Sequence, residues 1–308
     1  MNIKMMGSSL IIAGTALGAG MLAIPMVLAQ FGLLYGTLLM VLICFGTTYA
    51  ALLLLEATIK AGGGLGLNSI ARKTLGKQGQ LLTNGLLYAL LICLLMAYIL
   101  GAGDLLSKLL SNFGVELTAT TSQVVFTLLA GAVVASGTGV IDKLNRALFF
   151  VMLASLFATM VFLAPSMTQE NLMQVTSHDH VDLIKTSAIL FTSFGFMVVI
   201  PTLVSYNHEA TDKQLRNMVI VGSLIPLVCY LCWLFAVVGN LSEEQFRSFK
   251  NVSDLMAAFE AQSPWVGNVL STFTGLALLT SFFGVAMSLF NQNKDMFNQN
   301  TAVLRIPS

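Results

Sequence analysis

The stretch GTALGAGMLAIPM, from Gly14 to Met26, interrupts an apolar segment that is long enough to cross a membrane. It contains three glycines and one proline. Such a span is tolerated in lipid only where the opened backbone lines a cavity or packs inside protein, because unpaired backbone groups are costly in hydrocarbon. Gly14 and Gly18 also form a small-xxx-small pair, which is common where helices pack closely. The stretch therefore indicates either a binding cavity or a tight helix interface.

Composition decides the class of protein. Of the 308 residues, 56% are hydrophobic and 9% are charged, and the mean hydropathy is +0.84. An ordinary soluble domain has roughly 25% charged residues. We therefore expect an all-α protein that crosses the membrane several times, with the lipid bilayer as a partner and no nucleic acid. The oligomeric state is left open.

Apolar runs of spanning length are the main pattern along the chain, and each is close to the ~20 residues that a membrane-crossing helix needs. The eight runs cover residues 5–28, 33–55, 81–103, 122–141, 147–165, 184–205, 217–239 and 267–290. With a cytoplasmic N-terminus, eleven of the fifteen Lys and Arg residues lie on the inner side. The positive-inside rule therefore predicts that both termini are cytoplasmic.

The pattern of polar residues in the sequence does not indicate an enzyme. No Ser/His/Asp arrangement, phosphate-binding loop or pair of carboxylates within a span has a credible spacing. We therefore expect a protein that is not an enzyme. We predict no cofactor and no bound metal apart from a coupling ion, either a proton or sodium.

The sixth apolar run repeats the feature of the first. It reads TSAILFTSFGFMVVIP, from Thr186 to Pro201, and a small polar break is again followed by a second apolar piece and a proline. Interrupted spans at corresponding places in two halves are the sequence sign of an inverted-repeat transporter, with its substrate at the middle of the membrane. The expected divisions are a first five-helix repeat (1–165), an external connector (166–183), a partial second repeat of three helices (184–290) and a short cytoplasmic tail (291–308).

The two breaks also predict the class of ligand. A half-helix that begins at about residues 19–21 presents unpaired N–H groups and the positive end of its dipole, which suit a carboxylate. A half-helix that ends near Thr192 and Ser193 presents unpaired carbonyl groups, which suit an ammonium group or a cation. An α-amino acid fits both ends.

Five sequence blocks, in order along nearly the whole chain, resemble one known family. The blocks are GTALGAGMLAIPM (14–26), LTNGLLYALLICLLMAYILGAGDLL (82–106), FTSFGF (191–196), VGSLIPLVCYLCW (221–233) and LALLTSFFGVAMSLF (276–290). They are similar to the bacterial aromatic amino acid permeases, above all to the tyrosine-specific members. The resemblance implies a broken-helix transporter of the bacterial inner membrane that takes up aromatic amino acids, tyrosine first, by proton symport with alternating access. A sodium-coupled or serine/threonine-type permease, and a channel or receptor of the same fold, remain alternatives.

The resemblance also implies which residues hold the substrate. The backbone of Gly18, Ala19 and Gly20, with Thr15 nearby, matches the site for the carboxylate. The second break matches the residues Thr192, Ser193, Phe194, Gly195 and Phe196. Phe194 and Phe196 are expected to face an aromatic ring of the substrate, and Tyr88 and Tyr98 in the third span are weaker candidates of the same kind.

A cation site is implied in the same way. It joins the carbonyl groups of Gly14 and Leu17 to the hydroxyl groups of Thr280 and Ser281, although adjacent hydroxyl residues in a span often bond to their own helix instead. Proton-coupled relatives carry a lysine near this site in the fifth span, whereas Met152 stands at that position here. Because methionine cannot titrate, protons bound elsewhere, sodium and impaired coupling remain alternatives.

Family members continue for several spans beyond the end of this sequence. The resemblance therefore implies a C-terminally shortened member, in which helices that normally pack behind the core are missing. A transport-incompetent remnant is a further alternative.

Overall fold

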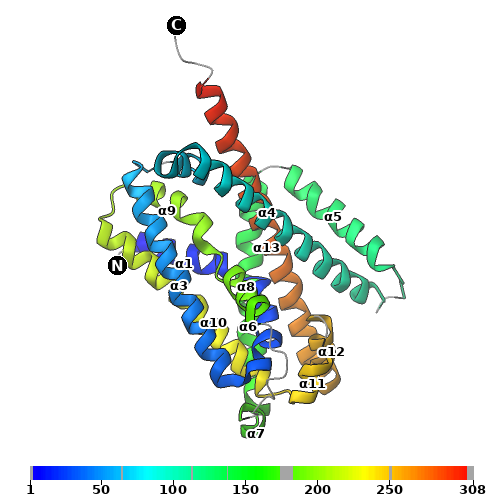
Figure 1. The fold of residues 1–308 in the computed structure, drawn as a ribbon. Helices are drawn as coiled ribbons and strands as arrows, with labels where there is room; N and C mark the ends of the chain where they lie inside the picture. Colours follow the sequence, from blue (N-terminus) through cyan, green and yellow to red (C-terminus); the bar gives the residue numbers. More distant parts are fainter. Residues whose placement is uncertain are drawn as a thin grey trace.

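The computed structural model describes residues 3–63, 65–111, 114–136, 138–173, 183–249 and 252–303, and every element in them is helical. The elements are, in chain order, α1 (Ile3–Ala16), α2 (Gly20–Leu28), η1 (Ala29–Phe31), α3 (Gly32–Lys60), α4 (Leu67–Ser111), α5 (Ala119–Ala135), α6 (Thr138–Leu163), η2 (Ala164–Ser166), α7 (Gln169–Leu172), α8 (Leu183–Ser193), η3 (Phe196–Val199), α9 (Ile200–Tyr206), α10 (Asp212–Val238), α11 (Glu243–Ser248), α12 (Val252–Gln262) and α13 (Pro264–Val303). The η elements are short 3₁₀ helices (Figure 1).

Six helical segments of the described residues are long and apolar enough to cross a membrane. This confirms a polytopic, all-helical membrane protein, but it does not confirm the expected number of eight spans. One of the six segments, Gly20–Lys60, joins α2, η1 and α3, which follow one another without a loop although the backbone leaves the helical range at Gly32, where φ is 71°. In addition, α5 is shorter than the other apolar segments.

Several helices extend beyond the predicted apolar runs, which gave the bounds of spanning stretches and not of whole helices. The helix α4 begins at Leu67, well before the predicted start at 81, and bends at Gly76, whose φ is 72°. The expected gap at 142–146 is part of α6, which begins at Thr138. The helix α13 runs on through 291–303, the first part of the predicted tail. Hydropathy identifies the apolar part of a helix and misses its polar turns. The predicted division into repeats stays a prediction, and 174–182 of the predicted connector lie outside the described residues.

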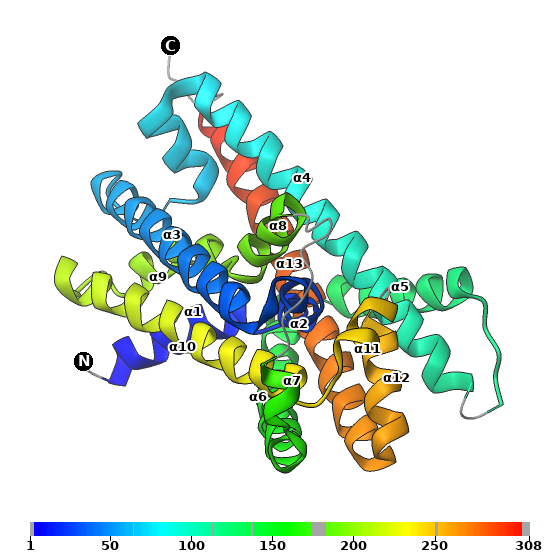
Figure 2. The same ribbon diagram turned by 60° about the horizontal axis from the view of Figure 1, so that its bottom comes forward.

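Two groups of helices pack around the broken segments. The half-helix α1 lies along α10, and α2 contacts α8, so that the first and sixth predicted spans meet in the middle of the molecule (Figures 1 and 2). The long helix α13 packs on α4 and α6. A shared hydrophobic core joins these helices and includes Trp233 and Phe273, whose rings lie edge to face with centroids 5.7 Å apart.

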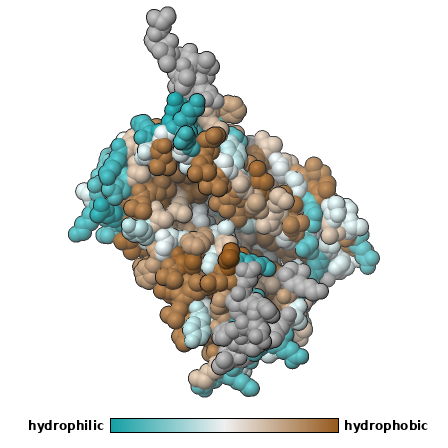
Figure 3. Space-filling view, in the orientation of Figure 1, coloured by the Kyte–Doolittle hydropathy of each residue, from teal (hydrophilic) through white to brown (hydrophobic). Residues whose placement is uncertain are grey.

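Large apolar side chains also cover the outside of the molecule, as a membrane protein requires. On α3 the exposed residues recur at helical spacing and form one stripe: Leu34, Leu38, Leu42, Phe45 and Tyr49. The face seen in Figure 3 is largely apolar, with hydrophilic residues mostly around its margins. An apolar surface of this extent is stable only against lipid.

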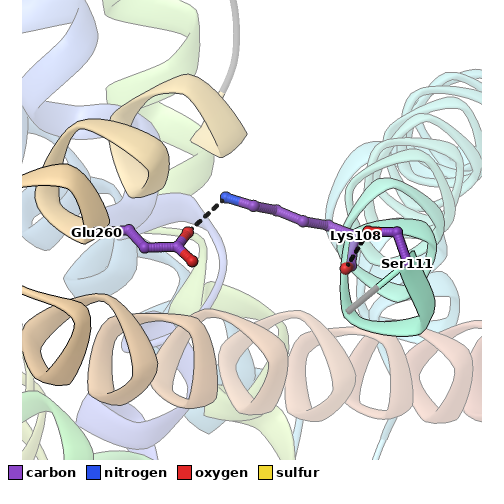
Figure 4. Close-up of polar contacts among 3 residues, drawn as sticks. All are labelled: Lys108, Ser111 and Glu260. Carbon is purple, nitrogen blue, oxygen red and sulfur yellow. Dashed lines mark hydrogen bonds and ion pairs between the residues drawn. The ribbon is translucent and has the colours of Figure 1, made fainter. Parts of the chain in front are cut away.

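An ion pair ties α12 to the end of α4. The Lys108 Nζ of α4 lies 3.1 Å from a carboxylate oxygen of Glu260 on α12, and Figure 4 shows the extended lysine side chain crossing between the two helices. Both side chains are about a third to a half exposed. The pair therefore contributes little stability. On its inner face α12 buries Leu255, Met256 and Phe259 against the bundle.

Candidate functional site

The first break lies inside the opening stretch of the sequence. The helix α1 ends at Ala16 and α2 begins at Gly20. The backbone bonds across this gap run from Leu17 N to Ala13 O at 2.8 Å and from Met21 N to Gly18 O at 3.1 Å. The chain therefore passes through the break as a tight turn, which lies between the carbonyl end of α1 and the N–H end of α2 and is largely buried.

The second break has the same construction. The helix α8 ends at Ser193, and the 3₁₀ helix η3 begins at Phe196. Between them Gly195 has a φ of −76° and a ψ of 33°, which is outside the helical range. A Cβ atom at Gly195 would lie 2.8 Å from Thr192 O, so the turn is tight enough to favour glycine there.

Small residues bring the two breaks into direct contact. The Ser193 hydroxyl, which has one proton to donate, lies 3.0 Å from Gly20 O and 2.8 Å from Ile189 O of its own helix, so the two carbonyl groups share it. A Cβ atom at Gly20 would lie 2.9 Å from Ser193 Cα. Gly20 and Ser193 thus make a close crossing of α2 and α8, which is the helix-interface role considered for the glycine-rich stretch. Its role in a binding cavity stays a prediction.

Ser281 of α13 satisfies a backbone group of the first break. The Ala19 N–H donates to Ser281 Oγ over 2.9 Å, at the N-terminus of α2. A Cβ atom at Gly18 would collide with the same hydroxyl, so Gly18 is required for this approach. Tyr98 of α4 also lies close to the Ser281 hydroxyl. Ser281, predicted as a cation ligand, therefore occupies the position that an anionic group takes at a helix N-terminus.

Tyr230 of α10 connects the two breaks, and no sequence pattern predicted it. Its side chain is fully buried, and its hydroxyl lies 2.6 Å from Ala16 O and 2.8 Å from Ser193 O. The ring packs edge to face on Phe194 with 5.0 Å between the centroids. A tyrosine within an otherwise apolar span needs a partner for its hydroxyl, and that requirement is the signal that could have identified it.

The other residues predicted to bind substrate either bond to their own helix or are packed in the core. Thr15 and Thr192 are exposed, and their hydroxyl groups donate to carbonyl groups of their own helices at 2.8 Å. Phe194 and Phe196 are fully buried in the core. These two rings therefore support the breaks rather than line an open cavity. Tyr88, a weaker candidate, bonds to Asn293 of α13.

The predicted cation site is only partly assembled. The Thr280 hydroxyl lies 2.8 Å from Leu276 O of its own helix and 3.7 Å from the sulfur of Met152. Met152 is fully buried, so it does fill the place next to Thr280. A Cβ atom at Gly14 would lie 3.0 Å from the ring of Phe149, so an aromatic ring covers this part of α1. Leu17 is buried.

A metal centre has no basis in the described part of the chain. No group of three His, Cys, Asp or Glu side chains lies close enough there to hold a metal ion.

A cavity of about 630 Å³ opens beside the second break. Val198 and Val199, which follow the break, line it together with Ile11 of α1 and Gly284 of α13. The far wall is polar and includes Gln292 and Asp295 of α13. The cavity lies toward the end of the molecule where α3 leads into α4 and α9 leads into α10 (Figure 1).

Buried amides hold the polar wall of this cavity. Gln292 donates to Asn84 Oδ1 over 2.8 Å, and Asn84 donates to Asn68 Oδ1 over 2.8 Å. Asp295 accepts hydrogen bonds from the side chain and the backbone N–H of Ser69, in the first turn of α4. These bonds join α4, at its first turn and at Asn84, to the last turns of α13.

Comparison with known proteins identifies the family of the chain. The sequence matches the tryptophan/tyrosine permease family over residues 1–306. The chain belongs to this family. The predicted resemblance to aromatic amino acid permeases is therefore confirmed.

Three relatives illustrate the range within the family. Glutamine transporter 2 of Aliivibrio fischeri is 60% identical over 98% of this chain and 78% of that protein. Tyrosine-specific transport system 1 of Haemophilus influenzae is 35% identical over 96% of this chain and 74% of that protein. The tryptophan-specific transport protein of the same organism is 28% identical over 98% of this chain and 76% of that protein. This permease is thus a multi-pass bacterial membrane protein whose relatives are transport proteins rather than enzymes.

Proposed function

We propose that this permease carries a neutral L-α-amino acid into the cell by symport with a cation, with alternating access to the two sides of the inner membrane. The observation that carries the proposal is the contact of the two helix breaks through Gly20 and Ser193. There the N–H end of α2 suits the ligand's α-carboxylate. The carbonyl ends of α1 and α8 suit its α-ammonium group.

Glutamine is the substrate that we propose first. The relative named as a glutamine transporter is 60% identical, whereas the relative named as tyrosine-specific is 35% identical. The structure gives a second reason, because Phe194 and Phe196 are packed in the core and present no free ring face to an aromatic ligand. Tyrosine, the substrate predicted from the sequence, is the second candidate and rests on the family match.

We further propose that the N-terminus is cytoplasmic and that the cavity faces the cytoplasm. The end of the molecule near the cavity carries the basic residues Lys60, Arg72, Lys73, Lys213 and Arg216, which the positive-inside rule places inside. For the coupling ion we propose sodium first, because Met152 beside Thr280 cannot release a proton. Proton coupling through another group is the second candidate.

Uptake into proteoliposomes that contain the purified chain tests this function. Labelled L-glutamine is supplied outside, and a sodium gradient or a pH gradient is imposed separately, with protein-free liposomes as the control. We expect accumulation above equilibrium with the sodium gradient and competition by excess unlabelled L-glutamine that is stronger than competition by L-tyrosine.

Other outcomes correct specific parts of the proposal. Accumulation driven only by the pH gradient contradicts sodium coupling, and stronger competition by L-tyrosine contradicts glutamine as the first substrate. Equilibration without accumulation under either gradient contradicts symport and favours a channel.

A further inference from the structure

The Tyr230 hydroxyl lies where the two broken helices present their carbonyl ends. Ala16 O belongs to the last residue of α1 and Ser193 O to the last residue of α8, and the hydroxyl oxygen is within 2.8 Å of both. Tyr230 itself comes from a third helix, α10, and is fully buried. One side chain thus holds together two backbone ends that are far apart in the sequence.

A single hydroxyl cannot satisfy both carbonyl groups fully. It has one proton to donate, whereas each carbonyl oxygen has two lone pairs. Both carbonyls also stand at the negative end of a helix dipole. An ammonium group carries three N–H donors and a positive charge, so it meets the needs of these two carbonyls better than a neutral hydroxyl does.

We propose that the Tyr230 hydroxyl occupies the position of the ligand's α-ammonium group in the empty protein and leaves it when an amino acid binds. This inference rests on the proposed function and names a positioning residue for it. Because the Tyr230 ring packs on Phe194, movement of the hydroxyl also disturbs a residue of the second break. Because α10 lies along α1, the same movement links occupation of the site to the first half-helix.

Removal of the hydroxyl tests the displacement. In Tyr230→Phe the carbonyl groups of Ala16 and Ser193 lose their donor, and the ligand no longer has to replace it. We expect the purified full chain in lipid nanodiscs to bind L-glutamine roughly three- to tenfold more tightly, the size of one net hydrogen bond. Glutaramate, which keeps the carboxylate and the amide but lacks the α-ammonium group, is expected to bind with unchanged affinity.

The control variant is Tyr49→Phe, which removes a hydroxyl from an exposed ring on α3 and is expected to leave both affinities unchanged. L-tyrosine and 3-(4-hydroxyphenyl)propionate form the same pair of probes if tyrosine is the substrate. Weaker binding of the amino acid to Tyr230→Phe contradicts displacement, because the hydroxyl then contributes to binding. An equal change for both probes also contradicts it.

A second measurement keeps the hydroxyl and does not depend on the variant folding. With 3-fluorotyrosine incorporated at position 230, we expect the fluorine NMR resonance to shift when L-glutamine saturates the protein and to stay in place with glutaramate. A resonance that does not move at saturation with either amino acid overturns the proposal. A chain that binds neither amino acid overturns the proposed function itself, which is a distinct result.

Discussion

At the scale of single residues, Gly18 and Gly20 matter for the space that they leave open. A side chain at Gly18 would collide with the Ser281 hydroxyl, and one at Gly20 would collide with the backbone of Ser193. The first glycine lets α13 reach the opened backbone, and the second lets α2 and α8 cross. At each close approach a serine hydroxyl then bonds to a backbone group. Ser281 accepts a hydrogen bond from Ala19 N–H, and Ser193 donates one to Gly20 O.

Gly20→Ala is expected to push α2 and α8 apart. The new Cβ atom meets backbone rather than a flexible side chain, so we expect a loss of about 1–3 kcal/mol of stability, as for other overpacked sites, together with loss of amino acid binding. Thermal unfolding in detergent, with and without L-glutamine, measures both effects.

The matched control is Gly46→Ala in α3, where a Cβ atom meets nothing within 4 Å. Since alanine favours helix over glycine, this variant is expected to be as stable as the native chain or up to ~1 kcal/mol more stable. If the two variants behave alike, the close crossing is not needed.

Ser281→Ala is expected to destabilise the empty protein more than the protein with bound ligand. Without the hydroxyl, Ala19 N–H lacks its acceptor, which costs about 1 kcal/mol at this half-buried position. A bound carboxylate restores an acceptor there, so the increase in Tm on adding L-glutamine is expected to be larger than in the native chain.

Ser155→Ala serves as the control for this variant. The Ser155 hydroxyl is exposed on α6 and donates to Val151 O of its own helix over 2.9 Å. Its loss is therefore expected to change neither the Tm of the empty protein nor the Tm of the protein with bound L-glutamine. A ligand-induced increase in Tm for Ser281→Ala that is smaller than in the native chain would show that Ser281 binds the ligand instead of holding its place.

At the scale of elements, the positions of the breaks could be predicted and their partners could not. Glycine and proline mark where a helix stops, so the end of α8 at Ser193 and the start of α2 at Gly20 fall within a residue or two of the prediction. The contacts of Tyr230 and Ser281 depend on which face α10 and α13 turn toward the breaks. A span that is apolar all round has no polar face from which that orientation can be read.

The full lengths of α4 and α13 could not be predicted for the same reason, because they depend on contacts between distant segments. The missed polar turns contain Asn68 and Gln292, which look like loop residues in a hydropathy pattern. Both are buried and bond to Asn84, which lies within the apolar run of α4. Each amide satisfies the next, so the turns stay helical beyond the apolar runs. Side-chain pairing between distant segments is a tertiary property, which a hydropathy pattern does not contain.

Asn84→Leu is expected to break this chain of amides. Gln292 then loses its acceptor and Asn68 one of its donors, and leaving such groups unpaired costs about 1–3 kcal/mol. Thermal unfolding measures the loss, with Thr127→Val as the control, because that exposed hydroxyl on α5 bonds only to its own helix at Gln123 O. Equal stability of the two variants would mean that the amides do not hold α4 to α13.

At the scale of the whole molecule, the two ends of the bundle differ. One end carries the cavity with its polar wall, and at the other end α12 packs its apolar face on α13 and α2. The Tyr230 hydroxyl lies buried between the two breaks. In this conformation the two carbonyl groups that it contacts are therefore closed to a ligand from both ends of the bundle. A ligand that binds there must therefore open the protein from one side, which is the behaviour that alternating access requires.

The most direct test of the central claim, that one zwitterion bridges the two breaks, is competition for binding of labelled L-glutamine to the purified chain. The competitors are L-glutamine, glutaramate, which lacks the α-ammonium group, and 4-aminobutanamide, which lacks the carboxylate. Because each break binds one of these groups, we predict that L-glutamine competes at least tenfold better than either analogue, a difference that corresponds to about 1.4 kcal/mol. If either analogue competes as well as L-glutamine, one of the two breaks takes no part in binding, and the account is wrong.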